Sequence, residues 1–314
     1  MIKFKLTKYF VAVSCLFFIG ACDNYYKNDY TDNSPTSGLL KVYHSEGLSL
    51  HIRNQAYTFS ALYPNVKITC EEVSESEAVD ALLKDSCKAI VINRLLGVSE
   101  QNAFANKQLN PRYSPLAKTG VALITNIKTP FKTLSMQQVN QLLTGELILT
   151  DSLNNKFKLR SVIDNKNSAV SHYLLDSIVT NHQFGANIFA LNNSLDLIEE
   201  ISKTPNSIGF IDFAWLSDSD DGLFKKYQDK IKFISIGRTD TIFFEPNQSS
   251  FKTGEYPLTR TIYLLRRSDD FSLAKGFEAF MAGPKGQLTF LKQGLLPIRQ
   301  AERTIHVNME PRGQ

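Results

Sequence analysis

The stretch that decides the fold is LLKVYHSEGLSLHIRNQAYTFSALYPNVKITC, residues 39–70. Its two ends, residues 39–44 and 66–70, are short apolar runs rich in β-formers, as expected for buried strands. Between them, residues 48–64 have apolar side chains at helical spacing, and Pro64 ends the pattern. A strand, a helix and a second strand joined by short connections predict a parallel sheet covered by helices.

The same alternation continues along the chain. Further strands are expected at residues 88–94, 120–126, 158–164, 207–215, 231–237 and 256–267, and helices at 75–86, 134–146, 168–179, 194–205, 271–283 and 285–294. About 275 residues follow residue 38, which is long for one core and suits two α/β lobes. Pro257 cannot donate a ladder hydrogen bond, so the strand it opens suits a hinge between lobes.

The N-terminus has the pattern of an export signal. Three lysines within residues 1–9 precede an apolar run, residues 10–19, that is too short to span a membrane. The run ends in Ile-Gly-Ala followed by Cys22, which resembles the bacterial lipobox, where the cysteine is diacylated and becomes the new N-terminus. An ordinary signal peptide with a chance cysteine is the alternative. We predict a lipoprotein signal peptide at residues 1–21 and lipidation at Cys22.

Residues 22–38 are polar and rich in turn formers, which predicts a flexible tether. After Cys22 there is no second apolar run of about 18 residues, so no later segment is expected to cross a bilayer. The protein is therefore expected in the cell envelope, anchored by lipid to a bacterial membrane and facing the periplasm or the cell surface.

Composition excludes several functions. The net charge is +4 with lysines scattered, so no basic stripe predicts nucleic-acid binding. The five histidines and four cysteines lack metal-site spacing, and no cofactor is expected. The chain contains no Gly-x-Ser-x-Gly elbow, phosphate-cradling Gly-Lys-Ser/Thr loop or His-x-x-x-His pair. We therefore predict that the protein is not an enzyme.

Two cysteines lie in the expected folded part. Cys70 closes one strand and Cys87 precedes another. If these strands run parallel, the thiols lie at opposite ends of the sheet, about 10 Å or more apart, and cannot form a disulfide. We predict that both are free, although an exported protein could oxidise them.

A first group of candidate ligand residues lies in VIDNKNSAVSHYLLDSIV, residues 162–179, where a strand passes into a helix. Asn167 or Ser168 is placed to begin the helix, whose free N–H groups at residues 168–170, including that of Ala169, favour an anion. Asn165 and Lys166 could add side-chain donors. The alternative is that Asn167 or Ser168 only caps the helix and the other residues are solvated.

The loop after the first strand has the same form. Ser45 offers a hydroxyl, Gly47 allows close approach of the backbone, and a helix follows. Glu46 would repel an oxyanion unless its carboxylate accepts a hydrogen bond from a protonated oxygen. Glu46 is equally compatible with a surface position in the first turn of the helix, where it complements the dipole.

Arg94 follows the third expected strand, at the edge where open α/β folds place ligand residues. Its guanidinium is suited to an oxyanion. Alternatively it pairs with an acid such as Glu46 or Glu100 and only braces the loop.

Seven segments in this order resemble one family. They are residues 40–47, 80–100, 120–146, 161–178, 206–215, 256–265 and 281–298, and together they cover about residues 39 to 300. Together with the lipobox that precedes them in the chain, they resemble the phosphate-type substrate-binding lipoproteins of bacterial ABC transporters, a branch of the type 2 periplasmic-binding-protein family.

The resemblance implies an α/β fold with two lobes joined by a two-strand hinge and a ligand cleft between them. We expect residues 39–124 and 257–314 to form lobe I and residues 125–256 to form lobe II. The implied function is capture of a small oxyanion, with phosphate first, by a monomer that delivers it to ABC permease subunits. The implied ligand-binding residues are Ser45, Glu46, Gly47, Arg94, Asn165, Asn167, Ser168 and Ala169, with no catalytic or metal-binding residue.

One departure concerns the second lobe. Phosphate binders of this family usually carry an Arg followed after a short gap by Ser-Gly-Thr. Here Ser168 matches the serine, Ala169 and Val170 replace Gly and Thr, and the arginine is missing. The alternative function is therefore a non-transport binding, sensory or interaction module with the same fold and a different ligand.

Overall fold

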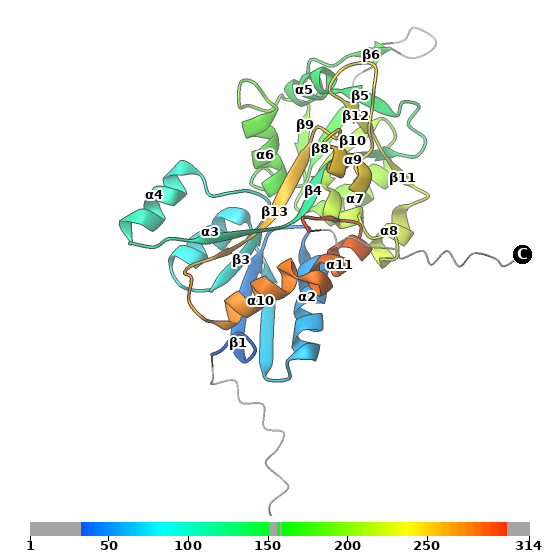
Figure 1. Ribbon diagram of the computed structural model, residues 1–314. Coiled ribbons are helices and arrows are strands. Elements are labelled where there is room, and N and C mark those ends of the chain that lie inside the picture. The colour runs from blue at the N-terminus through cyan, green and yellow to red at the C-terminus, as the bar shows by residue number, and fades with distance from the viewer. Residues whose placement is uncertain (1–32, 151–155, 158, 300–314) are drawn as a thin grey trace, which may run out of the picture.

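The computed structural model describes residues 33–150, 156–157 and 159–299 (Figure 1). The strands are β1 (Gly38–His44), β2 (Val66–Glu72), β3 (Ala89–Ile92), β4 (Arg112–Asn126), β5 (Thr133–Ser135), β6 (Leu149–Thr150), β7 (Lys156–Phe157), β8 (Arg160–Ile163), β9 (Ile188–Ala190), β10 (Ser207–Asp212), β11 (Ile231–Phe233), β12 (Ser235–Gly237), β13 (Thr259–Arg266) and β14 (Leu296–Pro297).

The α-helices are α2 (Ser49–Leu62), α3 (Glu75–Leu83), α4 (Val98–Asn106), α5 (Met136–Thr144), α6 (Ala169–Ser177), α7 (Ser194–Lys203), α8 (Gly222–Tyr227), α9 (Gln248–Thr253), α10 (Leu273–Ala282) and α11 (Pro284–Lys292). A short 3₁₀ helix, η1 (Phe213–Leu216), follows β10. The predicted signal peptide, the lipidation site at Cys22 and the first part of the predicted tether lie outside the described residues.

One mixed sheet runs through the molecule in the order β2-β1-β3-β13-β4-β10-β8-β9. The β1 strand pairs in parallel with β2 and β3, and β8 pairs in parallel with β9 and β10. The long strand β4 connects these two parallel groups, because its first part pairs with β13 and its last part with β10. The predicted α/β fold with two lobes is confirmed, and Figure 1 shows them meeting along β4 and β13.

We use lobe I for the half containing β1, β2 and β3 and lobe II for the half containing β8, β9 and β10. Helices α2, α3, α10 and α11 accompany lobe I, and α5, α6 and α7 accompany lobe II. The boundaries near residues 124 and 256 stay a prediction. At the return to lobe I, the buried Tyr256 hydroxyl donates to Val121 O at 2.8 Å, which ties the start of this segment to β4.

The sequence analysis predicted only the second half of β4, residues 120–126. The strand begins at Arg112 and contains Pro115, a residue that argues against a central strand. In the structure, the register between β4 and β13 shifts at this point: Ile262 lies opposite Ala117, whereas Tyr263 lies opposite Pro115. The irregularity accommodates the proline, because a bulge leaves the local ladder interrupted.

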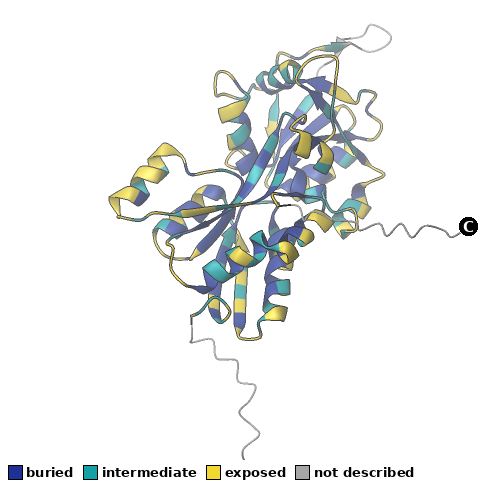
Figure 2. Cartoon of the chain, viewed as in Figure 1, coloured by how far each residue is buried: buried dark blue, intermediate teal, exposed yellow. Residues whose placement is uncertain are grey.

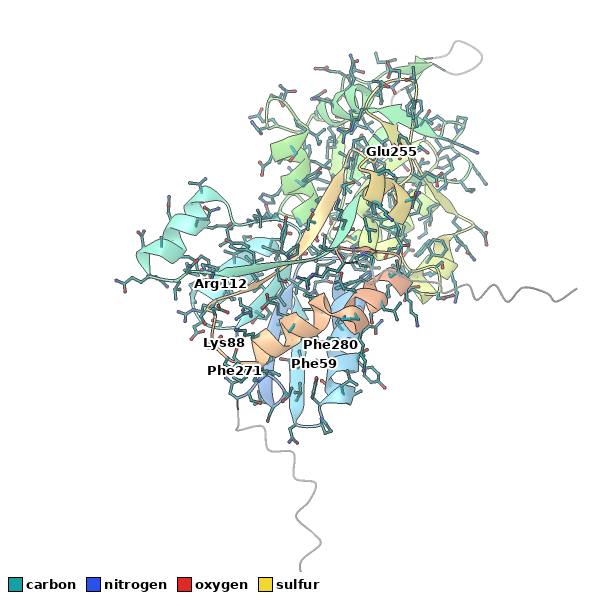
Figure 3. The ribbon with its side chains drawn as sticks, in the orientation of Figure 1. Phe59, Lys88, Arg112, Glu255, Phe271 and Phe280 are labelled. Carbon is teal, nitrogen blue, oxygen red and sulfur yellow. The ribbon has the colours of Figure 1, made fainter. Side chains whose placement is uncertain are left out.

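Buried residues fill the sheet and the inner faces of its helices (Figure 2). In lobe I, Phe59 of α2 packs against Phe280 of α10, with ring centroids 5.2 Å apart (Figure 3). The ring of Phe277, also on α10, lies 5.6 Å from that of Phe59. Such tilted contacts suit the aromatic quadrupoles. They hold α2 and α10 together on one face of lobe I.

Cys70 and Cys87 are both free, as predicted. Cys70 lies level with Val42 of β1, which in turn lies level with Ala89 of β3. The thiols are therefore separated mainly by the intervening strand β1, rather than by the length of the sheet as the sequence suggested. Burial raises the pKa of Cys70 to about 11 and that of Cys87 to about 12, which keeps both protonated.

The predicted tether, residues 22–38, is described only from Asn33 onward, and that end lies against α10. Leu273 N donates to Asn33 Oδ1 at 3.3 Å. No helix within the described residues is long and apolar enough to cross a bilayer.

Two neighbouring leucines of β1 test which side chains of this strand face the core. Leu40 is 3% exposed and Leu39 is 63% exposed. Leu40→Ala is expected to lower the free energy of unfolding by about 2–5 kcal/mol, because it leaves a cavity under the sheet. Leu39→Ala is the matched control and should change it by less than about 0.5 kcal/mol. Urea unfolding of both variants measures the difference, and equal losses would contradict the assigned register of β1.

Candidate functional site

The loop after β1 is held in place by buried polar contacts. Ser45 is fully buried, and its N–H donates to Val91 O of β3 at 2.9 Å. Its hydroxyl accepts a hydrogen bond from Asn93 Nδ2 at 3.2 Å. Gly47 has a φ of +83°, and a Cβ there would lie 3.0 Å from Trp215 Nε1. Glycine is therefore favoured at position 47 by the positive φ, and a Cβ there would also be tightly packed against the neighbouring indole.

The turn before α6 in lobe II is closed by its own side chains. Of the two predicted caps, Asn167 and Ser168, the N-cap is Ser168, and its Oγ accepts from Ser171 N at 3.0 Å. Asn165 Oδ1 accepts from Asn167 N at 2.9 Å, and Asn165 O accepts from Ser168 N at 3.4 Å. Asn165 therefore shapes the turn, while the side chain of Asn167 is exposed.

The two loops meet across the lobes. Ala169 N, the first N–H of α6, donates to Glu46 Oε2 at 3.2 Å. The sequence placed both residues in one candidate site, and the structure brings them into contact. Because a helix N-terminus carries unpaired N–H groups and partial positive charge, it attracts this carboxylate.

Burial raises the pKa of Glu46 to about 7, and repulsion from Asp164, Glu72 and Glu75 adds to the effect. The hydrogen bond from Ala169 opposes the shift but does not cancel it. Glu46 therefore changes charge near neutral pH, which the sequence did not reveal.

Asp212, at the end of β10, is the centre of the buried polar contacts. Its Oδ1 accepts from Thr119 Oγ1 at 2.8 Å and from Ala214 N at 2.9 Å. Its Oδ2 accepts from Asn93 Nδ2 at 3.0 Å and from an Nη of Arg260 on β13. Lobe I, lobe II and both connecting strands therefore contact one carboxylate.

Arg260 is equally buried: its side chain and that of Asp212 are each 3% exposed. Its other terminal nitrogen, Nη1, donates to Ala169 O at 3.2 Å, and its guanidinium lies over the Tyr173 ring, 5.4 Å from the centroid. Arg260 therefore positions the start of α6. The sequence analysis missed this pair; a charged residue inside each of two apolar strands was the only available signal.

Arg94 is occupied by carboxylates. Its Nε donates to Glu75 Oε2 at 2.9 Å, and Nη1 and Nη2 donate to the two oxygens of Glu100 at 2.7 and 2.9 Å. Glu75 also accepts from Asn93 N at 2.8 Å. This geometry supports the alternative in which Arg94 braces the loop after β3; the pairing with Glu46 does not occur. Direct ligand contact by Arg94 stays a prediction.

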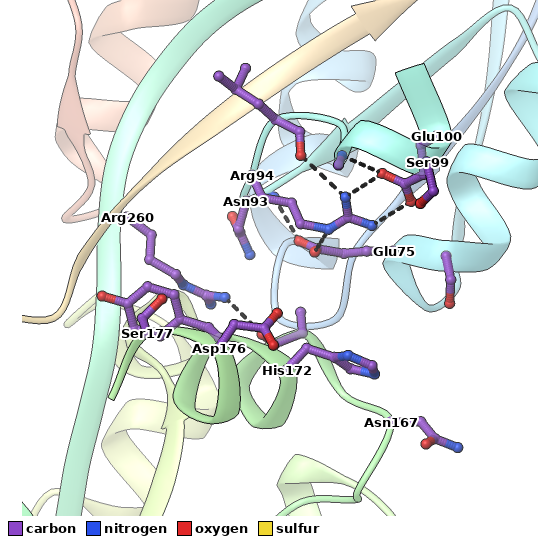
Figure 4. A pocket seen from close by; sticks show the side chains of 15 residues that line it. Glu75, Asn93, Arg94, Ser99, Glu100, Asn167, His172, Asp176, Ser177 and Arg260 are labelled. Carbon is purple, nitrogen blue, oxygen red and sulfur yellow. Dashed lines mark hydrogen bonds and ion pairs between the residues drawn. The ribbon is translucent and has the colours of Figure 1, made fainter. Parts of the chain in front are cut away.

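A cavity of about 540 Å³ lies between the two lobes, next to the ion pairs of Arg94 with Glu75 and Glu100 (Figure 4). The loop after β3, α6 and Arg260 line it. Arg94 and Arg260, the two arginines of the lining, are both paired with carboxylates. Asn93 Oδ1 and Arg260 Nε are buried without a partner in the structure. The Asn93 amide orientation is fixed, because Nδ2 donates to Asp212, which can only accept.

His44 is the histidine closest to Ser45. It is buried, its Nδ1 lies 3.1 Å from Ser45 O, and burial lowers its pKa. It supports the loop wall rather than acting as a base. Within the described ranges, no group of three or more His, Cys, Asp or Glu residues is placed to hold a metal ion.

Comparisons with known proteins agree on one family. A family model described as PBP superfamily domain matches residues 33–285. A phosphate-binding protein, PstS, from Pseudomonas aeruginosa is 23% identical over 299 residues, covering 88% of this chain and 89% of that protein.

Solved structures show the same fold at low identity. A substrate-binding protein from Clostridium perfringens, solved with bound phosphate, aligns with a TM-score of 0.68 and 17% identity, covering 83% of this chain and 100% of that one. An ABC-type phosphate transport receptor from Vibrio cholerae gives a TM-score of 0.63 and 17% identity, with the same coverage.

The Asp212–Arg260 pair is expected to dominate local stability. Asp212→Ala leaves the Arg260 guanidinium buried without its carboxylate, which should lower the free energy of unfolding by about 3–5 kcal/mol. The matched control is Asp220→Ala, whose side chain is 95% exposed and which should have little effect. Urea denaturation compares them; a loss for Asp212→Ala as small as the control's would contradict a buried charge pair.

The pKa of Glu46 predicts how stability depends on pH. The folded protein binds this proton up to about pH 7, whereas the unfolded chain releases it near the ordinary value of 4.5. The unfolded state therefore binds fewer protons in this interval, and the Glu46 contribution to the free energy of unfolding decreases as pH rises through it. Glu46→Gln should gain stability relative to the wild type between pH 4.5 and 7.5 in urea unfolding. Parallel pH profiles would contradict the raised pKa.

Proposed function

The chain belongs to the periplasmic-binding-protein (PBP) superfamily, and we propose that it captures a small oxyanion, phosphate first, for an ABC transporter. One observation carries the proposal: an anionic oxygen, Glu46 Oε2, already lies at the N-terminus of α6. A position that holds a carboxylate oxygen by a backbone N–H is suited to an oxygen of phosphate. The relatives named as phosphate-binding proteins support the same ligand.

In this proposal both lobes contribute neutral donors. Ala169 N, positioned by the Ser168 cap, comes from lobe II, and the hydroxyl of Ser45 and the backbone at Gly47 come from lobe I. Arg260 Nε, buried and without a partner, is a further donor on the floor between them. Closure of the lobes would replace the hydration shell of the anion with these donors. Because the arginines are already paired, affinity would depend on hydrogen bonds and dipoles more than on net charge.

The remaining parts of the proposal concern delivery. A lipid on Cys22 would anchor the protein to a bacterial membrane, with the folded part on the periplasmic or outer face. The closed form, as a monomer, would dock on the permease subunits of the transporter. The matching relatives are binding proteins and not enzymes, consistent with the prediction from the sequence.

A second candidate is a non-transport binding or sensory module with the same fold. The cavity of about 540 Å³ is larger than a tetrahedral anion needs, and three carboxylates, Glu75, Glu100 and Asp176, line it. A ligand panel of phosphate, sulfate, molybdate and phosphate monoesters separates the two. A phosphate monoester bound more tightly than phosphate would favour this second candidate.

Isothermal titration with phosphate at low and high salt tests the proposed function. Binding heat is expected at both, with a weaker salt dependence than a surface ion pair would show, because the donors are buried and the one charged donor, Arg260, is already paired with Asp212. Absence of heat at every salt concentration and pH would reject phosphate as the ligand.

The contribution of α6 can be tested at one atom. Ala169→Pro removes the N–H without breaking the helix, since proline is favoured at the first helical position. The preceding Ser168 has φ −71° and ψ 158°, which a residue before proline adopts readily. At pH 5.5, where Glu46 is protonated, phosphate binding should weaken about tenfold or more.

The matched control is Gly222→Pro, at the first position of α8, where an added Cβ meets nothing within 4 Å. It should leave phosphate binding unchanged. If Ala169→Pro binds phosphate as tightly as this control, the N-terminus of α6 is not part of the anion site.

A further inference from the structure

The position at the N-terminus of α6 where an anion would bind is occupied by a side chain of the protein itself, that of Glu46. Ala169 N donates to Glu46 Oε2 at 3.2 Å, and Ser168 N is bonded to Asn165 O within the turn. An external oxyanion that uses the Ala169 N–H must therefore displace the Glu46 carboxylate, because the two would compete for one donor. This consequence rests on the proposed function.

The charges around Glu46 make it unfavourable for an anion to bind while the Glu46 carboxylate is ionised. Asp164 faces it from the turn after β8, Glu72 from the end of β2, and Glu75 from the start of α3; all three raise its pKa by repulsion. His44, the last residue of β1, is also near in sequence, and burial lowers its pKa.

The nearby cations do not compensate. Arg94 is bonded to Glu75 and Glu100, and Arg260 is bonded to Asp212. An incoming anion would therefore meet an ionised Glu46 and the carboxylate of Asp164 together. Two or more like charges in a partly buried site repel strongly.

We propose that Glu46 is the specificity-determining residue of the site: its ionised carboxylate is a tethered competitor for the anion position, and an oxyanion binds only with Glu46 protonated. Protonation reverses the role of the side chain. A neutral carboxyl no longer repels the anion, and its O–H becomes a hydrogen-bond donor to a ligand oxygen. One proton is therefore taken up by the protein with each anion bound above neutral pH.

The pH at which the competition changes follows from the position of the carboxyl. Its pKa of about 7 means that Glu46 is mostly neutral at pH 5.5 and mostly ionised at pH 8. If only the neutral form admits the anion, affinity falls about tenfold for each pH unit above 7. A site of this kind retains its ligand in mildly acidic surroundings and releases it in alkaline ones.

The test compares phosphate affinity of the wild type and Glu46→Gln by isothermal titration from pH 5.5 to 8.5. Protonation of phosphate itself affects both proteins equally and cancels in the ratio of their dissociation constants. The ratio, wild type over variant, should be near one at pH 5.5 and rise to about tenfold at pH 8. Glu46→Ala provides the same comparison should the glutamine variant not fold.

The matched control is Glu71→Gln, which removes the same charge but whose carboxylate pairs with Lys41 at the surface. Its affinity ratio to the wild type should stay flat with pH. Sulfate is a second probe, because its charge is constant over this pH range. Any loss of wild-type affinity for sulfate as pH rises is then caused by a titrating group of the protein.

The outcomes separate the two proposals. No heat for wild type and Glu46 variants at any pH rejects phosphate binding itself. Binding by the wild type with a ratio that stays flat between pH 5.5 and 8.5 keeps the proposed function and overturns the role of Glu46.

Discussion

The arrangement of the cleft depends on one buried carboxylate, that of Asp212. It accepts hydrogen bonds from the loop after β3, from β4, from the start of η1 and from Arg260 on β13. Arg260 in turn reaches Ala169 O at the first residue of α6. Since an unpaired buried charge is costly, these groups have to assemble together, and their assembly fixes where the two lobes face each other.

Local signals predicted much of the fold and part of the site. The alternation of strands and helices indicated the parallel groups. The cap of α6 was narrowed to Asn167 or Ser168, because capping depends on adjacent residues, and the structure shows Ser168. Pro115 concealed half of β4, because the bulge that accommodates it forms only against β13. The sequence offered Glu100, six residues away, as a partner of Arg94, and the structure shows that pair. The Asp212–Arg260 pair and the contact of Arg94 with Glu75 were missed, because each joins residues farther apart in sequence, which no local pattern specifies.

The charge balance of the site also accounts for the departure seen in the sequence. The second-lobe turn, which lacks the arginine that the resemblance implies, begins with Asp164, whose carboxylate is buried and accepts from Ser194 Oγ at 2.9 Å and Asn165 N at 2.8 Å. It stabilises the turn from within. The positive charges that line the cleft are those of Arg94 and Arg260, and both are already paired with carboxylates. Under the proposed function, recognition would depend on the direction of donors more than on attraction at a distance.

The contact between Gly47 and Trp215 has a practical consequence. The chain contains one tryptophan, it is partly buried, and it extends from the segment after β10 against the loop that follows β1. Its indole therefore lies at the seam between the halves, where a change in their separation alters its contact with solvent. Intrinsic emission of this single fluorophore thus gives a label-free optical signal of the relative movement of the halves, free of background from any second indole.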